Sequence, residues 1–563
     1  MQEDRSPRWA SWGAVALVVV LVAVNVAWWH AHRAGGPVDL DEAWYLDLAF
    51  HASGPGHRVL TAPYVLWREP SFQAPLLPAL TLPLHYGLGR TLAVSYLVLS
   101  VVLAALVAAT YLLGRRLTTT AGWALLAAAV TATLPGIVDY SRHYHFALAA
   151  TTTFTAGLLT LVRTRRFTHR GWSLGFGLAL GLLVLSRTIM LAFAPGLVVA
   201  AVWSVTRLPR GERSAAWRNL ALALGLAALV AGSWYVFSFR SVWHYLTGWG
   251  YGEQSRQYGA ASIASARFWL GDAAAVVGEG LYLPTAVLLL AAAVLGTTTG
   301  AWRRSCTWRR VADSDALLVA VPLALGAAAL LSSRNDGTGF VLPLLPGAVV
   351  LVVAVASRAR PPMLARVLGG ALLAAGALTL VTKAQVLDPL DREVAVEAAP
   401  WARLPVVDAS SLIDRYVEAY TGAPNDDRTR AWTDAVDELL AGSSAGEGGT
   451  TTDLATTVDG PMVSAPLLQL RAVLAGRDDV RVASVDRSTT DADDPEALAA
   501  VLADLTDQGF TRLLTGPERL AWTGFGLPED LTTAAARRAG FTPAGEVELP
   551  DGGRITVWTA PTP

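Results

Sequence analysis

The sequence predicts a polytopic α-helical membrane protein that ends in an α/β domain outside the membrane. First, 53% of its 563 residues are hydrophobic and only 16% are charged, with a mean hydropathy of +0.41. Second, long apolar runs recur between Trp9 and Val381, many of them close to the ~20 residues that cross a bilayer. Third, from about Asp388 the composition becomes polar, and strand-like segments alternate with helix-like ones.

Hydropathy predicts about eleven membrane-spanning helices. They are expected at about Trp9–Trp29, Leu92–Leu113, Trp123–Val138, Ala147–Val162, Trp172–Ser186, Thr188–Val205, Leu220–Phe239, Leu281–Thr298, Ala316–Leu331, Phe340–Ala356 and Val367–Val381. Arginine clusters follow every second span. By the positive-inside rule the N-terminus is therefore cytoplasmic and the C-terminal domain extracytoplasmic. We expect a multi-pass protein of the plasma membrane, and the near absence of lysine favours a bacterial source.

Composition also excludes several classes of protein. The net charge is −1, so no bulk attraction to nucleic acid is expected. The single cysteine, Cys306, excludes an intrachain disulfide and a cysteine-rich metal site. A phosphate-binding loop of the P-loop type is not found in the sequence, so ATP hydrolysis is not expected.

Two domains are predicted. Residues 1–384 form the transmembrane domain, whose first extracytoplasmic loop covers about 31–75, and residues 385–563 form the extracytoplasmic α/β domain. Within the second domain a largely parallel sheet is expected. Its strands are predicted at Leu454–Val458, Val480–Val485, Thr511–Leu514, Ala544–Leu549 and Arg554–Thr559, and its helices at Pro466–Leu474, Pro495–Asp507 and Pro528–Ala539.

An acidic stretch follows the first span directly. The apolar residues of Asp39–Phe50 recur at helical spacing, which predicts a short helix at the membrane surface with carboxylates at its N-terminal end. Two interpretations remain open. Asp39 and Glu42 have the spacing of a helix cap, and acids favour the first helical turn. Alternatively, acids beside hydrocarbon are retained because they act in catalysis.

The predicted topology gathers further polar residues on the same membrane face. The acids are Asp39, Asp41, Glu42 and Asp139, and the basic residues are Arg58, Arg142, His143, His145, Arg187 and Arg334. Arginine binds a phosphate well, and a carboxylate can take a proton from an acceptor hydroxyl. A lipid phosphate can leave without a strong general acid. These groups suit glycosyl transfer from a lipid-phosphate sugar.

At these motifs the sequence resembles the GT-C glycosyltransferases of the protein O-mannosyltransferase and lipid A aminoarabinose transferase type. The resemblance rests on the acidic pair Asp41-Glu42, the proline-rich segment Gln73-Ala-Pro-Leu-Leu-Pro78 and the late segment from Arg334 to Pro346. It covers about residues 9–384. It implies that Asp41 is the catalytic base and that Glu42 supports it. Asp139 lies nearest to the place of a second acid in this family.

The sequence therefore predicts a hexosyl- or pentosyltransferase that uses a polyprenyl-monophosphate sugar donor and inverts the anomeric centre in a single displacement. Asp41 and Glu42 are the expected catalytic residues; the expected substrate-binding residues are Asp139, Arg142, His143, Arg187, Arg334 and Arg58. The expected partners are the membrane, the lipid-linked donor and a glycan, lipid or protein acceptor. No cofactor is firmly implied, and a divalent metal ion is left open. The alternatives are a transporter or flippase of a lipid-linked envelope precursor and a non-catalytic envelope assembly protein.

Overall fold

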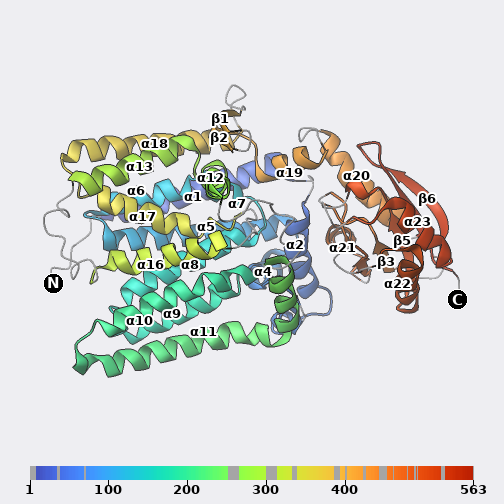
Figure 1. Cartoon of the computed structure of the whole chain (residues 1–563), viewed down its shortest axis with the longest axis horizontal. Coiled ribbons are helices and arrows are strands. Elements are labelled where there is room, and N and C mark those ends of the chain that lie inside the picture. The colour runs from blue at the N-terminus through green and yellow to red at the C-terminus, as the bar shows by residue number, and fades with distance from the viewer. Residues whose placement is uncertain are drawn as a thin grey trace. The chain divides into compact units, whose positions relative to one another are not determined.

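A computed structural model shows how the chain folds (Figure 1). It describes residues 8–34, 38–68, 71–250, 265–299, 313–332, 339–385, 393–399, 402–421, 427–442, 453–460, 462–478, 480–486, 490, 492–520 and 526–561. The chain divides into two compact units. The first unit comprises Met1–Trp28, Tyr64–Leu80 and Tyr96–Ser410, and the second comprises Trp29–Pro63, Thr81–Ser95 and Ser411–Pro563. The domain boundary after residue 384 stays a prediction.

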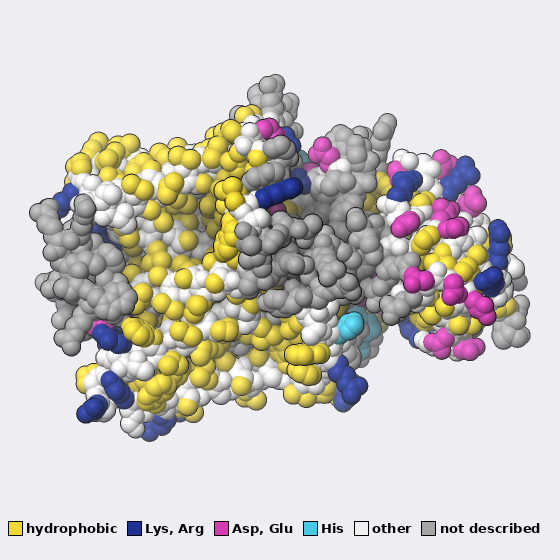
Figure 2. Space-filling view, viewed as in Figure 1, with side chains coloured by type: hydrophobic (Ala, Val, Ile, Leu, Met, Phe, Trp, Pro, Cys, Tyr) yellow, Lys and Arg dark blue, Asp and Glu magenta, His cyan; other side chains and the backbone are white. Residues whose placement is uncertain are grey.

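Helices make up most of the chain before residue 384. Besides α2 they are α1 (Arg8–His32), α3 (Ala62–Arg68), α4 (Leu76–Leu88), α5 (Leu92–Leu117), α6 (Ala121–Ala132), α7 (Pro135–Tyr140), α8 (Phe146–Arg163), α9 (Arg170–Val184), η1 (Thr188–Ala192), α10 (Ala194–Thr206), α11 (Arg210–Tyr245), η2 (Leu246–Gly250), α12 (Ala266–Ala275), η4 (Val276–Leu281), α13 (Leu283–Thr299), α16 (Asp315–Ser332), α17 (Leu344–Ala356) and α18 (Pro362–Lys383). Figure 2 shows hydrophobic side chains over most of the visible face of these helices. Such a surface is expected where helices face lipid.

The helical membrane fold predicted from hydropathy is confirmed. Every predicted span falls on one or two of the described helices. Among the described residues, six helices are long and apolar enough to cross a membrane, or seven if the bent pair Ala266–Leu281 and Leu283–Thr299 forms one span. The chain is therefore a multi-pass membrane protein. The exact number of crossings stays a prediction.

Two departures from regular helix shape the region of the candidate site. The chain leaves α9 at Leu185, is extended at Arg187, with φ −163° and ψ 147°, and then enters η1. The charge predicted to split two apolar runs thus lies at a real break. Helix α11 continues to Tyr245, beyond the end of the expected span at Phe239. At ~1.5 Å per residue its 36 residues are longer than the ~30 Å hydrocarbon layer requires for one crossing.

Helices α9 and α11 pack closely because small residues face each other (Figure 1). Gly177 and Gly181 on α9 meet Ala223 and Ala227 on α11. A Cβ atom at Gly177 would lie 2.2 Å from the carbonyl oxygen of Ala223, and one at Gly181 would lie 2.9 Å from Cβ of Val230. In a membrane, where lipid is as apolar as the side chains, such backbone approach is a main source of helix association.

The second unit holds an α/β fold around a five-stranded sheet. The strand order is β4-β3-β5-β7-β6, with β3 parallel to β4 and β5, and β7 antiparallel to β5 and β6. Its strands are β3 (Asp453–Thr456), β4 (Val482–Ser484), β5 (Phe510–Thr515), β6 (Thr542–Glu548) and β7 (Arg554–Thr559). All five expected strands are present, but the expectation of a largely parallel sheet was wrong, because β7 is antiparallel to both of its neighbours. The short connection 549–553 permits only a hairpin, because parallel neighbours need a long crossover. A separate hairpin, β1 (Val394–Ala399) and β2 (Ala402–Val407), belongs to the first unit.

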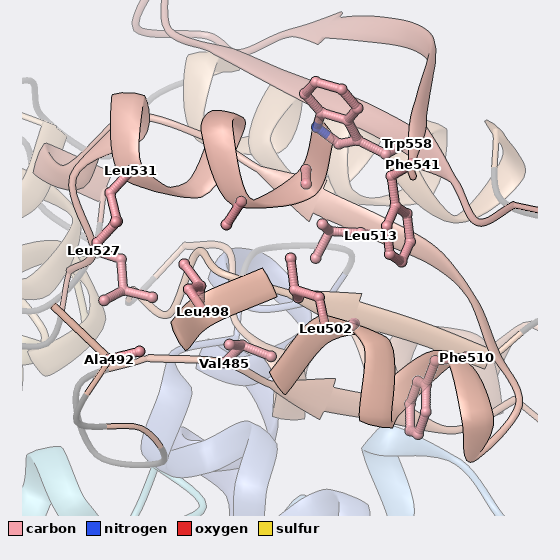
Figure 3. Close-up of a cluster of buried hydrophobic side chains, with 13 residues drawn as sticks. Val485, Ala492, Leu498, Leu502, Phe510, Leu513, Leu527, Leu531, Phe541 and Trp558 are labelled. Atoms are coloured by element: carbon pink, nitrogen blue, oxygen red, sulfur yellow. The ribbon is translucent and has the colours of Figure 1, made fainter. Parts of the chain in front are cut away.

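The helices of this unit cover the sheet. They are α19 (Leu412–Thr421), α20 (Asp427–Gly442), α21 (Ala465–Leu474), α22 (Pro495–Asp507), η6 (Glu518–Leu520) and α23 (Glu529–Arg538). Figure 3 shows the apolar core in which Leu498 and Leu502 of α22 and Leu531 of α23 meet Leu513 and Trp558 of the sheet. In Figure 2 the acidic and basic side chains gather over this part of the chain. An apolar core beneath a charged surface is typical of a domain that lies in water.

Candidate active site

The predicted acidic helix is present as α2 (Leu40–Ala52). Asp39 is its N-cap, and the Oδ1 atom of Asp39 accepts a hydrogen bond of 3.0 Å from the backbone N–H of Glu42. This cap satisfies one of the donors that every helix start leaves unpaired. Asp41 lies in the first turn and is half-buried. The capping role proposed for the acidic stretch is therefore filled by Asp39, and Asp41 is not the cap.

Glu42 is fully buried and forms an ion pair with Arg33. The Arg33 side chain is almost as deeply buried, at 3% exposure. Removing one partner of such a pair leaves an uncompensated buried charge, which typically costs about 3–5 kcal/mol. Glu42 thus holds the start of α2 in place, and the catalytic support expected from it stays a prediction. Sequence reasoning missed Arg33, although its place just after the first span was a usable signal.

The far end of α2 is attached to the C-terminal part of the chain. Within the second unit α2 packs against α21. Arg90 donates through Nε and Nη2 to the carbonyl oxygen of Phe50, at 3.1 and 2.7 Å. The same guanidinium binds both carboxylate oxygens of Asp478. A forked arginine contact of this kind fixes orientation as well as distance. The acidic helix and the α/β fold are therefore held together.

A buried histidine secures the same helix end. His85 Nδ1 lies 2.8 Å from Ser53 Oγ, and His85 Nε2 lies 2.8 Å from Ser95 Oγ. Burial, and secondarily the charge of Arg90, lowers the pKa of His85 to about 4. Both effects disfavour the imidazolium. At neutral pH His85 is therefore an uncharged link between the end of α2 and the first turns of α5.

Asp139 and Arg142 lie in a buried polar network of the first unit. The Lys383 Nζ donates to Asp139 Oδ2 at 3.0 Å. Arg142 donates through Nε to Asn25 Oδ1 at 2.9 Å and through Nη1 to the carbonyl oxygen of Lys383 at 2.5 Å. Its guanidinium also lies 4.7 Å from the ring centroid of Trp28. These contacts join α7, α1 and the end of α18, and the network gives both residues internal protein partners.

The two neighbouring histidines form an aromatic group with Tyr140. The His143 ring lies 6.1 Å from the Tyr140 ring and 5.7 Å from the His145 ring. His145 is the N-cap of α8, and its Nδ1 accepts from the N–H of Ala147 at 3.4 Å. His145 therefore has a local structural role. The substrate contact expected for His143 stays a prediction.

Arg187 lies among aromatic rings. Its guanidinium carbon lies 4.7 Å from the ring centroid of Phe146 and 5.7 Å from that of Tyr245, and Nη2 lies 3.5 Å from the Tyr245 hydroxyl. Tyr245 is stacked on Phe72 at 4.9 Å. The Phe340 ring lies 5.5 Å from that of Phe146. Cation–π contacts hold the arginine in a fixed position, and a guanidinium is a group suited to bind an anion.

The remaining predicted cations are Arg58 and Arg334, and their substrate contacts stay predictions. Arg58 is exposed, and its backbone forms a turn closed by the bond from Thr61 N–H to the Arg58 carbonyl oxygen, 2.8 Å. Arg334 lies outside the described residues. For a metal ion, Asp39 and Glu42 offer carboxylate oxygens within 4.8 Å of each other. Oxygen ligands of this kind suit Mg²⁺ or Ca²⁺.

Comparison with solved structures shows a shared fold over nearly the whole chain. ArnT from Cupriavidus metallidurans, solved bound to undecaprenyl phosphate, matches with a TM-score of 0.55 and 14% identity, covering 96% of this chain and 97% of that chain. The arabinofuranosyltransferase AftD from mycobacteria matches with a TM-score of 0.53 and 16% identity, covering 97% of this chain and 40% of that chain. Searches against family models and curated proteins find no match. The chain thus shares its fold with ArnT and AftD, in agreement with the fold that the sequence resemblance implied.

Proposed function

We propose that this protein is a glycosyltransferase that moves a hexose or pentose from a polyprenyl-monophosphate donor to an acceptor on the extracytoplasmic face of the membrane. The main support for this proposal is the different surroundings of the three acids at the start of α2. Asp39, the helix cap, and Glu42, the ion-pair partner of Arg33, are both buried, whereas Asp41 on the same turn is half-buried and is the most accessible of the three acids. Asp41 is therefore the acid of this turn best suited to meet an acceptor.

The donor phosphate is assigned to Arg187 in this proposal. Its guanidinium is held by aromatic rings at the break between α9 and η1, and the chain shares the fold of an enzyme solved with undecaprenyl phosphate. A phosphate fixed by its lipid tail at the membrane surface needs a cation at that depth. Arg334 is proposed as a second phosphate contact, and Arg58, Asp139, Arg142 and His143 as further substrate-binding residues, all from the sequence alone.

The proposed reaction is a single displacement. The acceptor hydroxyl oxygen attacks the anomeric carbon, and the bond between that carbon and the phosphate oxygen breaks. Asp41 takes the hydroxyl proton, and the lipid phosphate leaves as an anion that arginine stabilises. Attack opposite the leaving group inverts the anomeric centre. Glu42 holds the helix that carries the base.

Transfer by purified protein separates this proposal from its alternatives. Polyprenyl-monophosphate hexose and pentose donors, labelled in the sugar, would be supplied with an envelope extract as the source of acceptors. The proposal expects label to leave the donor for a new product while lipid phosphate accumulates. Movement of intact donor from one leaflet to the other in sealed vesicles would favour a flippase. Binding without transfer or movement would favour an assembly protein.

A further inference from the structure

Gln73 has a side chain that the fold does not explain. It is 1% exposed, and among the residues that the structure describes neither its carboxamide oxygen Oε1 nor its nitrogen Nε2 has a hydrogen-bond partner. Its backbone N–H donates to Ser71 Oγ at 3.0 Å. Burying an amide without partners is costly, and proteins rarely retain such groups without a reason. A bound ligand would give both polar atoms of this side chain a hydrogen-bond partner.

The segment that carries Gln73 runs beside the segment that carries Arg187. Thr188 Oγ1 donates to the carbonyl oxygen of Phe72 at 2.6 Å, and the N–H of Leu76 donates to the carbonyl oxygen of Leu185 at 3.0 Å. The stacking of Phe72 on Tyr245 fixes the same segment against the aromatic group around Arg187. All of these residues belong to the first unit. The unexplained amide thus belongs to a segment that runs beside the one carrying the arginine to which we assign the donor phosphate.

The chemistry of the amide distinguishes between the parts of the donor. A phosphate oxygen only accepts hydrogen bonds, so it would pair with Nε2 and leave Oε1 buried without a partner. A hydroxyl both donates and accepts, and two neighbouring hydroxyls of a sugar satisfy both atoms of a carboxamide. We propose that Gln73 binds hydroxyl groups of the sugar that the lipid donor carries. This proposal rests on the proposed function and extends it, because it separates a sugar contact at Gln73 from a phosphate contact at Arg187.

The substitution Gln73→Met tests the proposal, since methionine has a similar length and shape but no hydrogen-bonding amide. Gln469 is a matched control, because its Nε2 donates to the Val480 carbonyl oxygen at 2.7 Å and its Oε1 accepts from Val482 N–H at 2.9 Å. In the unliganded full-length protein, Gln73→Met should raise the thermal unfolding midpoint, whereas Gln469→Met should lower it. If Gln73→Met instead lowers the midpoint, the amide is paired through buried water as part of the fold, and the proposal fails.

Ligand binding supplies the second readout. Undecaprenyl phosphate without a sugar should bind wild-type protein and Gln73→Met within about twofold of each other. Undecaprenyl-phosphate mannose and decaprenyl-phosphate arabinofuranose serve as sugar-bearing probes, and the one that wild-type protein binds more tightly should lose about tenfold in affinity on Gln73→Met, the range expected for one polar contact. An equal loss for sugar-bearing and sugar-free lipid would place Gln73 at the phosphate and overturn the proposal while leaving the proposed function intact. Failure of wild-type protein to bind any of these lipids would instead count against the proposed function itself.

Discussion

Arg187 illustrates how one charged residue organises its surroundings. A charge cannot remain inside an apolar run at low cost, so the helix ends before it and resumes after it as η1. The break turns the side chain towards Phe146 and Tyr245, which hold it by cation–π contacts. The sequence predicted the break but not the rings, because Tyr245 follows Arg187 by 58 residues.

Replacing this arginine should weaken donor binding. Arg187→Ala and Arg334→Ala should each cost about 1.5–3 kcal/mol, the range for a hydrogen bond to a charged group, which is roughly ten- to a hundredfold in affinity. Equilibrium binding of the lipid donor measures the effect. Arg163 serves as control, because it also stacks on an aromatic ring, 4.9 Å from the Trp172 centroid, but lies at the end of α8 that is predicted to be cytoplasmic. Unchanged donor affinity in both variants would mean that these cations only anchor the protein in the membrane.

His85 should make stability depend on pH. Its pKa is about 4 in the folded protein, against 6.5 for an unperturbed histidine. Between these values the unfolded chain binds a proton that the folded protein does not, so stability falls as the pH is lowered from 6.5 towards 4. The thermal unfolding midpoint of wild-type protein should therefore drop more steeply over this interval than that of His85→Gln. Parallel curves for the two proteins would contradict the buried neutral state.

The sequence alone predicted those residues whose roles depend only on their neighbours in the chain. Asp39 as a cap and Arg187 as a break follow from neighbouring residues alone. The pairing of Lys383 with Asp139 could not be predicted in the same way. Lys383 follows Asp139 by 244 residues, and only the fold brings the two charges together. The unpaired state of Gln73 is likewise a property of packing.

Elements were predictable wherever their pattern is set by the surrounding solvent. Lipid selects apolar helices, so hydropathy located every predicted span on a described helix. In the second unit, strand-like runs that alternate with helical ones predicted all five sheet strands close to their observed bounds. Strand direction was only partly predicted, because the order of strands and helices does not by itself fix it. The packing of α2 against α21 was also beyond prediction, since it joins segments separated by more than 400 residues.

The pairing of α9 with α11 predicts a sharp size limit at Gly177. A side chain there would meet the backbone of Ala223 at 2.2 Å, whereas one at Gly225 of α11 meets nothing within 4 Å. Gly177→Val should therefore lower the thermal unfolding midpoint strongly, and Gly225→Val should change it little, because helix association in lipid depends on close backbone approach. Equal midpoints for the two variants would show that α9 and α11 are not packed as described.

For the whole molecule, arginine placement predicts sidedness. If the positive-inside rule holds here, the N-terminus and Cys306 face the cytoplasm and the C-terminal α/β fold faces outward. Cys306 lies outside the described residues, but it is the sole cysteine and so gives a clean label. An impermeant thiol reagent should label it in broken membranes and not in intact cells. A reporter fused after Pro563 should be active only outside the cytoplasm. Labelling of Cys306 in sealed cells would reverse the predicted topology and move the acids of α2 to the cytoplasmic side.

The proposed transfer mechanism depends on Asp41 as the general base. Asp41→Asn keeps the size of the side chain but cannot take a proton, and it leaves the cap intact because Asp39 is the capping residue. Asp39→Asn is therefore the matched control, since asparagine caps a helix about as well as aspartate. Both variants should retain the thermal unfolding midpoint and the donor affinity of wild-type protein.

The most direct measurement is the rate of sugar transfer with saturating donor in wild-type protein, Asp41→Asn and Asp39→Asn. Asp41→Asn should transfer roughly a hundredfold more slowly or worse, the scale of a lost general base, while Asp39→Asn stays within severalfold of wild type. Transfer by Asp41→Asn at close to the wild-type rate would exclude Asp41 as the base and leave Glu42 or Asp139 to be tested in its place.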